Sequence, residues 1–375
     1  MEILMLSSVC SIINQAPRQF DGSKEYVATG DIQNSEIISS KEVTFQNRPS
    51  RANCTVDSGD ILFAKMANTE KTLIAEEIHE KMLFSTGFAV LRPIPEVLDS
   101  GYLYHVLRSE KFLLEKDRLS SGATQKAITN KALLNIKIPI PPLNEQRKIS
   151  AILDKADEVK QSFEKSTEKR DEIIRSTFLE MFGDLNINPK RWKLVLLDDL
   201  VDKLGDGIHG TPVYHENGDY FFINGTNLRD KRIEILENTK RVSELEYLKH
   251  KKELNSSTMF VSINGTVGNV AYYNGEPVML GKSVCYFNVK ESEVSRTYLY
   301  YLIKSSYFTN YARGKSTGST IRNLSLKAMR TLPIPLPPME LQYQFAQYVK
   351  FFEKIPNPIT LATNNSLSIF QELLK

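Results

Sequence analysis

The chain has 375 residues, of which 41% are hydrophobic and 25% are charged, so its length and composition are those of a globular protein with two or three domains. Its three cysteines lie far apart and form no C-x-x-C pair, which argues against a disulfide framework or a zinc site and suits a reducing cytosol. No stretch approaches the ~20 apolar residues of a membrane helix, and the formal net charge of +3 does not by itself indicate a partner. We therefore expect a soluble, cytoplasmic protein.

The first part of the chain predicts short strands followed by one helix. The segments DILFAK (60–65) and FAVLRP (88–93) are rich in β-branched or aromatic residues, as strands are. A helix is predicted over Asp99–Leu114, and the polar stretch RLSSGATQKAITN (118–130) predicts a loop after it. A short strand then leads into the proline phrase KIPIPPLNEQRKIS (137–150).

A long helix is predicted after the proline phrase. It runs from Leu143 to Phe182, roughly 60 Å at 1.5 Å per residue, with Asn144 as its N-cap and Gly183 as its C-cap. Residues spaced by three and four positions form a heptad seam that is apolar at both ends of the helix. Its apolar members are Ile149, Ile152, Ala156, Val159, Phe163 and Ile173. A helix of this length cannot bury such a stripe against itself, so we expect a partner helix.

The rest of the chain repeats this plan. The proline phrase returns as PIPLPPMELQYQFA (333–346), with an offset of 196 (335 − 139), which is too long for a short-period solenoid and indicates a duplicated domain. Predicted strands again precede a helix, over Arg296–Tyr311, and a polar loop, RGKSTGSTIRNLS (313–325). The ends of the two repeats keep register while their middles diverge.

A second helical arm follows the second proline phrase. Its seam residues are Leu341, Phe345, Val349 and Phe352. Pro356 and Pro358 predict a break in this arm, since a proline inside a helix costs about 3 kcal/mol or more.

The predicted fold is α+β, with two tandem mixed α/β domains separated by long helices that pack as an antiparallel coiled coil. The predicted boundaries are 1–142 for the first domain, 143–183 for the central helix, 184–335 for the second domain and 336–375 for the C-terminal arm.

Two windows of the sequence lack acidic residues. Residues 118–144 and 294–339 contain no Asp or Glu but keep several Lys and Arg, which is what a surface facing phosphates requires. An ordinary solvated loop is the alternative. The DNA-binding residues predicted in and beside these loops are Ser120, Ser121, Thr124, Gln125, Lys126, Arg313, Lys315, Ser316, Thr317, Ser319, Thr320 and Arg322. Candidates for base reading in the divergent middles are Lys65, Asn68, Asn264 and Lys282, and His209 is a further polar or DNA-facing candidate.

The sequence shows no set of catalytic parts. Asn357-Pro-Ile-Thr360 lacks the second proline and the aromatic residue of an adenine-methyltransferase turn. Leu280-Gly-Lys-Ser283 matches the end of a phosphate-binding loop, but Glu276 occupies the position of its first glycine. We predict a binding module with no cofactor, no metal site and no catalytic residue.

Four stretches together resemble the specificity subunit of a type I restriction–modification system. They are IPIPPLNEQRKI (138–149), its echo LPIPLPP (332–338), the helix end STFLEMFGD (176–184) and WKLVLLDDL (192–200). The resemblance covers nearly the whole chain. It implies two target-recognition domains that each read one half of a bipartite, asymmetric site in double-stranded DNA, and long helices that act as a ruler.

The resemblance also implies partners. These are two methyltransferase (modification) subunits, which would dock on the long helices, and motor-nuclease (restriction) subunits. Two alternatives stay open from the residues alone: an independent two-lobed DNA-modifying or DNA-cleaving enzyme, and a protein scaffold that does not bind DNA.

Overall fold

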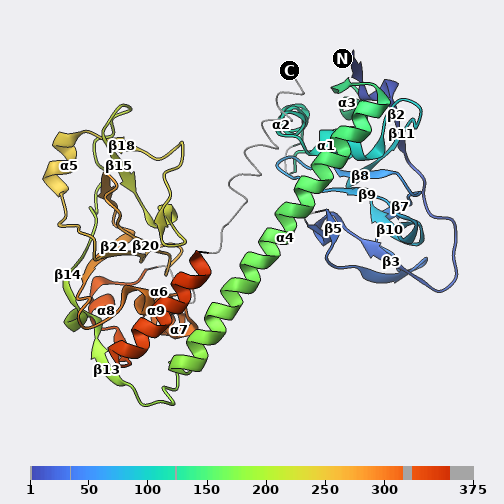
Figure 1. Ribbon diagram of the computed structural model, residues 1–375. Coiled ribbons are helices and arrows are strands. Elements are labelled where there is room, and N and C mark those ends of the chain that lie inside the picture. Colours follow the sequence, from blue (N-terminus) through green and yellow to red (C-terminus); the bar gives the residue numbers. More distant parts are fainter. Residues whose placement is uncertain (1, 34, 123–124, 316–322, 355–375) are drawn as a thin grey trace. The chain divides into compact units, whose positions relative to one another are not determined.

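The computed structural model describes residues 2–33, 35–122, 125–315 and 323–354, and these form two compact units (Figure 1). The first unit contains the chain up to Glu164 and the second begins at Lys165. The long helix α4 (Leu143–Phe182) therefore contributes its first part to one unit and its last part to the other. In the described part of the chain, every helix is too short or too polar to span a bilayer.

The first unit contains two four-stranded sheets and a cluster of short helices. One sheet is antiparallel, in the order β2-β11-β8-β9, and the other has the order β6-β3-β10-β7 with β3 and β10 parallel. A separate two-stranded ribbon pairs β1 with β12, and a small hairpin pairs β4 with β5. The strands are β1 (Glu2–Met5), β2 (Cys10–Ile13), β3 (Ser23–Val27), β4 (Ile32–Gln33), β5 (Glu36–Ile37), β6 (Lys41–Thr44), β7 (Ala52–Cys54), β8 (Ile61–Ala64), β9 (Thr72–Ile74), β10 (Leu83–Ser85), β11 (Phe88–Pro93) and β12 (Lys137–Ile140). The helices are α1 (Ser100–Arg108), α2 (Glu110–Leu119) and α3 (Asn130–Leu134), with short 3-10 turns at Leu6–Ser8, Thr29–Asp31 and Glu77–Lys81.

The second unit repeats this plan with additions. Its antiparallel sheet has the order β14-β22-β19-β20, its second sheet has three strands in the order β18-β15-β21, and its ribbon pairs β13 with β23. The strands are β13 (Lys193–Leu196), β14 (Val201–Asp206), β15 (Tyr220–Ile223), β16 (Leu228–Arg229), β17 (Arg232–Ile233), β18 (Arg241–Val242), β19 (Thr258–Ser262), β20 (Val270–Tyr272), β21 (Val278–Leu280), β22 (Val284–Val289) and β23 (Pro333–Leu336). The helices are α5 (Glu244–His250), α6 (Arg296–Ile303), α7 (Ser306–Lys315), α8 (Leu326–Arg330) and α9 (Met339–Glu353), with 3-10 turns at Leu197–Leu200 and Gly225–Asn227.

The helix predicted over Asp99–Leu114 is two helices, and so is its counterpart over Arg296–Tyr311. Ser109 ends α1 in an extended conformation, and its hydroxyl accepts a hydrogen bond from the Phe112 N–H, which starts α2. Serine competes for backbone hydrogen bonds in this way, so it favours caps over helix interiors. Ser305 occupies the same junction between α6 and α7.

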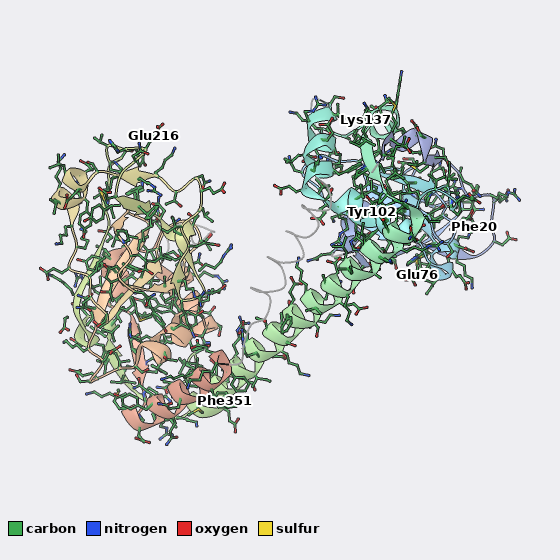
Figure 2. The ribbon with its side chains drawn as sticks, turned by 45° about the horizontal axis from the view of Figure 1, so that its top comes forward. Phe20, Glu76, Tyr102, Lys137, Glu216 and Phe351 are labelled. Carbon is green, nitrogen blue, oxygen red and sulfur yellow. The ribbon has the colours of Figure 1, made fainter. Side chains whose placement is uncertain are left out.

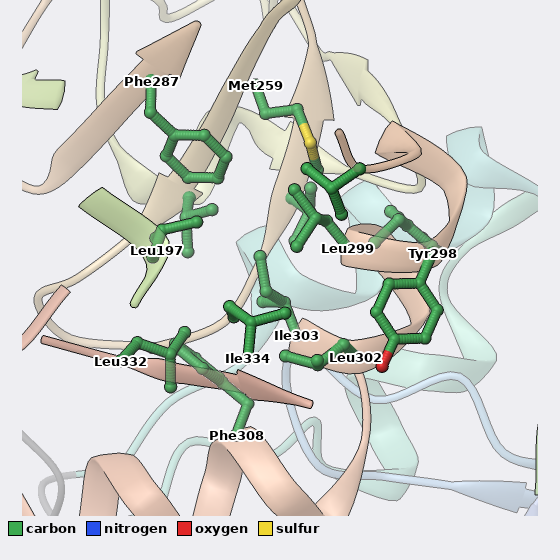
Figure 3. Close-up of a cluster of buried hydrophobic side chains, with 14 of the residues drawn as sticks. Leu197, Met259, Phe287, Tyr298, Leu299, Leu302, Ile303, Phe308, Leu332 and Ile334 are labelled. Carbon is green, nitrogen blue, oxygen red and sulfur yellow. The ribbon is translucent and has the colours of Figure 1, made fainter. Parts of the chain in front are cut away.

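Each unit has its main apolar core where its helices cover the antiparallel sheet. In the second unit, Met259 and Phe287 from the sheet meet Leu299 and Ile303 from α6 (Figure 3). Leu332 and Ile334, around the start of β23, close the same cluster. The proline phrase is therefore part of the core.

Equivalent hydrogen bonds hold the two proline phrases in place. The buried Tyr102 hydroxyl donates to the Pro139 carbonyl, and the Tyr298 hydroxyl donates to the Pro335 carbonyl. Figure 2 labels Tyr102 within the first unit. Because these tyrosines are also 196 residues apart in sequence, the duplication extends to individual hydrogen bonds.

Two fully buried glutamines make a second equivalent set of bonds. Gln146 accepts from the Asp99 N–H and donates to the Pro141 carbonyl, while Gln342 accepts from the Ser295 N–H and donates to the Pro337 carbonyl. Each glutamine thus ties the start of α1 or α6 to the turn that begins α4 or α9.

The predicted long helix is present from Leu143 to Phe182. Asn144 lies inside its first turn rather than before it, because the helix begins one residue earlier. Gly183 follows the helix with φ +78°, the left-handed conformation that glycine adopts most easily, and its N–H donates to the Leu179 carbonyl.

The seam residues have several environments. Ile149 packs against the core of the first unit, Ala156, Val159 and Phe163 are half-buried, and Ile152 is exposed. In the second unit, Ile173 is exposed while its neighbour Ile174 is buried. The remaining seam residues are in α9, where Phe345 and Val349 are buried and Leu341 and Phe352 are half-buried against the core.

The contact between α9 and α4 is made by aromatic rings within the second unit. The Phe345 ring centroid lies 5.4 Å from those of Phe178 and Phe182. A coiled coil along the whole of α4 stays a prediction, and Pro356 and Pro358 lie outside the described residues.

Candidate nucleic-acid interface

In the first unit, two loops that carry predicted DNA-binding residues run side by side. The Ala67 N–H donates to the Lys126 carbonyl, and the Ile128 N–H donates to the Lys65 carbonyl, each at 2.9 Å. These bonds join the loop after β8 to the polar loop after α2. Lys65 and Asn68 therefore lie on one loop, directly beside Lys126 on the other.

The second unit builds the same junction from its own residues. The Leu324 N–H donates to the Ile263 carbonyl at 2.8 Å, and Asn264 forms a β-bridge with Asn323. Leu324 is 196 residues after Ile128, the offset of the proline phrases. The two candidate edges are therefore structural repeats of each other.

Two further loops meet this edge in the second unit. The Asn264 side-chain amide donates to the Lys282 carbonyl at 3.1 Å, and Ile208 forms a β-bridge with Gly281. His209 and Lys282 are the residues directly after Ile208 and Gly281, so they lie close together on neighbouring loops. The structure brings together the three candidates that the sequence placed in separate segments.

A buried lysine that the sequence interpretation missed orders the edge of the first unit. Lys116 is fully buried, and its ammonium group donates to the Met66 carbonyl at 3.0 Å and the Thr69 carbonyl at 2.6 Å. Burial lowers the pKa of Lys116 from its ordinary value, and the nearby Asp117 carboxylate opposes this shift. Asp117 also accepts the N–H of Asn68, whose φ is +54°. Lysine is almost never fully buried unless it is paired, so the sequence around Lys116 gave no indication that its ammonium group would order this loop.

The second unit orders its loop with different groups. The residue equivalent to Lys116 is Ala312, which is buried. The Ser262 hydroxyl donates to the Thr266 carbonyl at 2.5 Å and accepts the Asn269 N–H at 2.8 Å. One loop is therefore organised by a buried cation and the other by a hydroxyl.

Most of the described candidates are accessible to a ligand. Asn68, Ser121, Gln125 and Lys126 are exposed in the first unit, as are His209, Lys282, Arg313 and Lys315 in the second; Lys65 and Asn264 are half-buried. Burial lowers the pKa of Lys65.

Besides Asn264, two more candidates have side-chain partners within the protein. Ser120 is half-buried and donates its hydroxyl hydrogen to the Lys116 carbonyl, which makes it a helix-end group. The His209 ring lies 2.8 Å from the Asp206 carboxylate. The candidates Thr124, Ser316, Thr317, Ser319, Thr320 and Arg322 lie outside the described residues.

The described residues contain no group of three or more His, Cys, Asp or Glu that could hold a metal ion. The stretch Leu280–Ser283 is not arranged as a phosphate-binding nest, because the Gly281 N–H donates to the Ile223 carbonyl. All three cysteines are buried, and burial raises the pKa of Cys10 to about 12. What the two edges offer is exposed amides, hydroxyls and cations, the groups that contact phosphates and base edges.

Comparisons with known proteins match the duplicated architecture. The family model of the type I restriction modification DNA specificity domain matches residues 2–173 and again residues 189–368. A curated relative from Methanocaldococcus jannaschii, the type I restriction enzyme MjaVIII specificity subunit, is 22% identical over 90% of this chain and 81% of its own length. The putative type I restriction enzyme MjaX specificity subunit of the same organism is 24% identical over 79% of this chain and 72% of its own length.

One solved structure shows the same fold. The S subunit of a type I restriction–modification system from M. genitalium is 15% identical, with a TM-score of 0.57, and the match covers 100% of this chain and 94% of that chain.

Proposed function

Because the chain belongs to the family of type I restriction modification DNA specificity domains, and is a non-catalytic specificity subunit of such a system, we propose that each of its two units reads one half of a bipartite DNA site. One observation carries this proposal. The backbone bond from Ile128 to Lys65 returns as the bond from Leu324 to Ile263, while the side chains around it differ. Two readers on one scaffold with different side chains suit an asymmetric target with an unread gap.

The side chains at the two edges divide by chemistry. The exposed cations Lys126, Lys282, Arg313 and Lys315 suit phosphate contacts, which hold a protein in register without reading sequence. The amides of Asn68, Gln125 and Asn264 and the imidazole of His209 suit hydrogen bonds to base edges in the major groove. In this proposal, sequence reading depends on the second group.

The proposed division of labour follows the predicted domain boundaries. Residues 1–142 and 184–335 are the two target-recognition domains, residues 143–183 are the spacer, and residues 336–375 form the second arm. The spacer sets the gap between the half-sites, and methyltransferase and motor-nuclease subunits dock on the helical parts. The support for this arrangement is the length of α4 and the way each unit buries one end of it.

The test begins by finding the target. Methylation sequencing of a host that carries the complete system should give one bipartite, asymmetric motif with a fixed gap. A continuous motif, or a palindrome read by a dimer of this chain, would contradict the two-reader proposal. Methylation or cleavage of DNA by the purified chain alone would instead favour an independent enzyme.

The phosphate contacts are then tested one cation at a time. Lys126→Ala should weaken binding to every sequence and lower the slope of log affinity against log salt by about one unit, which is the loss of one phosphate contact. Lys155→Ala is the matched control, because Lys155 is an exposed lysine of α4 that pairs with Glu158 on the same helix and belongs to neither candidate loop. An unchanged slope for Lys126→Ala would rule out its phosphate contact.

A further inference from the structure

Both units carry a two-stranded ribbon that leads directly into a helix, α4 in the first and α9 in the second. In the first, β1 pairs with β12 so that Ile3 lies opposite Pro139; in the second, β13 pairs with β23 so that Leu194 lies opposite Pro335. Two residues separate each ribbon from the helix that follows, since β12 and α4 are joined by residues 141–142 and β23 and α9 by residues 337–338. The two ribbons therefore occupy the same place in the two repeats.

The inner face of each ribbon belongs to the core. Leu4 packs against the buried Ile138 in the first unit, and Val195 packs against the core that contains the buried Ile334 in the second. A ribbon with one face on a core normally presents polar residues on its other face. The sequence of these ribbons departs from that pattern.

The outer faces are apolar and exposed in both units. Ile3 and Met5 are 65% and 44% exposed, and their counterparts Leu194 and Leu196 are 57% and 43% exposed. All four burial positions of β1 match those of β13. Charge is present only at the ends of the ribbons, for example at Lys137, which Figure 2 labels at the surface of the first unit.

The repeat itself limits what can cover these faces. The interiors of the two units have diverged, and an exposed apolar group that includes Val213 and Leu245 occurs on the second unit beside α5, a helix inserted relative to the first. The apolar outer face, by contrast, is kept in both copies of the ribbon. A feature retained twice in a diverged pair points to one kind of partner that binds twice.

The chemistry of the faces selects among partners. DNA binding depends on cations that neutralise phosphates. The outer face of the first ribbon carries one cation, Lys137 opposite Met5, and the outer face of the second carries none, since it consists of Leu194, Leu196 and the prolines opposite them. Apolar side chains of this kind suit the centre of a protein–protein interface. In the proposed complex, the protein present in two copies is the methyltransferase subunit.

We propose that the outer face of each ribbon is a docking surface for one methyltransferase subunit, with Ile3 and Met5 contacting one copy and Leu194 and Leu196 contacting the other. This inference rests on the proposed function, which supplies the partner. The surface is continuous in sequence with α4 and α9, so a subunit that contacts a long helix can reach the ribbon before it. The two docking surfaces are independent, and each can be removed alone.

The experiment uses the full chain together with the methyltransferase subunit of the same restriction–modification system. Native mass spectrometry counts the methyltransferase subunits bound to the wild-type chain, to Ile3→Gln/Met5→Gln, to Leu194→Gln/Leu196→Gln and to the fourfold variant. The expected numbers are two, one, one and none at a concentration where the wild type is saturated. Each altered face should weaken binding of its copy by at least about tenfold, as loss of apolar groups at an interface centre does.

Matched variants separate docking from general effects. Val213→Gln/Leu245→Gln removes exposed apolar groups that the first unit does not repeat, and it should still bind two subunits. Replacing the four ribbon residues with Thr instead of Gln keeps a residue that favours strands. These variants should bind the same numbers of methyltransferase subunits as the Gln variants, because the ribbons stay folded in both. DNA binding by the isolated variants should equal that of the wild-type chain.

Three results would overturn the inference. A fourfold variant that still binds two methyltransferase subunits removes the ribbons as docking surfaces. A wild-type dimer of this chain that the fourfold variant dissociates, with the methyltransferase count unchanged, identifies a second copy as the occupant. A wild-type chain that binds no methyltransferase subunit overturns both this inference and the docking part of the proposed function.

Discussion

The two units hold the long helices with different chemistry at equivalent positions. In the first unit, α1 reaches α4 through polar pairs: the His105 ring lies 2.7 Å from the Asp154 carboxylate, and Arg108 pairs with Asp157. In the second unit, the residue equivalent to His105 is Tyr301, whose ring packs edge-on against Phe345 at 5.2 Å between centroids.

A turn of each unit joins the same contact. The Tyr104 hydroxyl donates to Ser35 in the hairpin of β4 and β5. The equivalent turn of the second unit places the Lys231 ammonium 4.6 Å from the Tyr300 ring and pairs it with Glu353. Both units place a cation against this tyrosine ring, Arg108 over Tyr104 in the first and Lys231 over Tyr300 in the second, but the first cation comes from the helix α1 and the second from the turn. The repeat therefore preserves the positions at which each helix is held, but the strength of the interactions at those positions can differ between the units.

The largest expected difference lies at Phe345 and its counterpart Ile149. Phe345 is fully buried among aromatic rings, so Phe345→Ala should lower the free energy of unfolding by about 3–5 kcal/mol, whereas Ile149 is half-buried and Ile149→Ala should cost about 1–2 kcal/mol. Trp192, the single tryptophan of the chain, packs against the second core, so its fluorescence reports on the second unit alone.

Denaturant titrations followed by Trp192 fluorescence check this comparison. The midpoint should fall for Phe345→Ala and stay unchanged for Ile149→Ala. Phe351→Ala is the control, because Phe351 is an exposed ring of the same helix, α9. Equal shifts for Phe345→Ala and Phe351→Ala would show that the aromatic cluster does not anchor α9.

The buried glutamines should show the opposite pattern, with similar effects in both units. Gln146→Leu and Gln342→Leu keep the bulk of the side chain but leave a buried N–H and at least one carbonyl without a partner, so each should cost about 1–3 kcal/mol. Gln146 should cost more, since it also donates to the Val97 carbonyl.

Hydrogen exchange of the α1 and α6 amides measures the loss of local stability in both glutamine variants by the same method. Gln344→Leu is the control, since Gln344 is exposed on α9 two residues after Gln342. A loss of protection after Gln146→Leu without one after Gln342→Leu would mean that only the first proline phrase depends on its glutamine.

Much of the architecture could be predicted because the repeat carries it. The offset of the prolines also relates Gln146 to Gln342 and Ile128 to Leu324. Gly183 predicts the end of α4, and its start lies one residue before the predicted cap, Asn144. Local chemistry was harder to foresee. The serine junctions between paired helices are capping choices that a helical pattern conceals.

The buried Lys116 shows why the candidate site was less predictable than the fold. A lysine in an amphipathic segment is expected to face solvent, and only the tertiary structure reveals the two carbonyls that hold it. The heptad seam was less informative about burial for a related reason. Periodicity identifies a stripe on α4, but it does not say that Ile149 meets a domain core while Ile152 meets solvent.

Acid should weaken the first anchor and leave the second unaffected. Burial lowers the pKa of His105 below its ordinary value of 6.5, against the opposing effect of Asp154. Above that value His105 is neutral in both the folded and unfolded chains. As the pH falls below it, the unfolded chain takes up a proton more readily than the folded chain, so stability is lost down to the folded pKa.

Hydrogen exchange of α1 compared between pH 7 and pH 5.5 measures this effect. Protection should fall in the wild type, and the fall should be smaller in His105→Gln, which does not titrate. Tyr301 holds the equivalent position in the second unit, so α6 should show no such difference between the two proteins. The same pH dependence in wild type and His105→Gln would assign the loss to other groups.

The smallest expected effects concern the acidic residues that both helices keep at the same register, Asp157 and Glu353. Each carboxylate forms an ion pair near the surface. Such pairs contribute about 0–1 kcal/mol to the free energy of unfolding, and salt screens this contribution. Glu353→Gln leaves Lys231 its contacts with two tyrosine rings, and Asp157→Asn leaves Arg108 its pairing with Glu70 at 3.3 Å. We therefore expect Glu353→Gln to shift the Trp192 midpoint slightly at low salt and not at high salt, and Asp157→Asn to change only the exchange of α1. A large, salt-independent loss from either variant would show that the shared acid fixes the helix in both units, and that the change of chemistry around it is secondary.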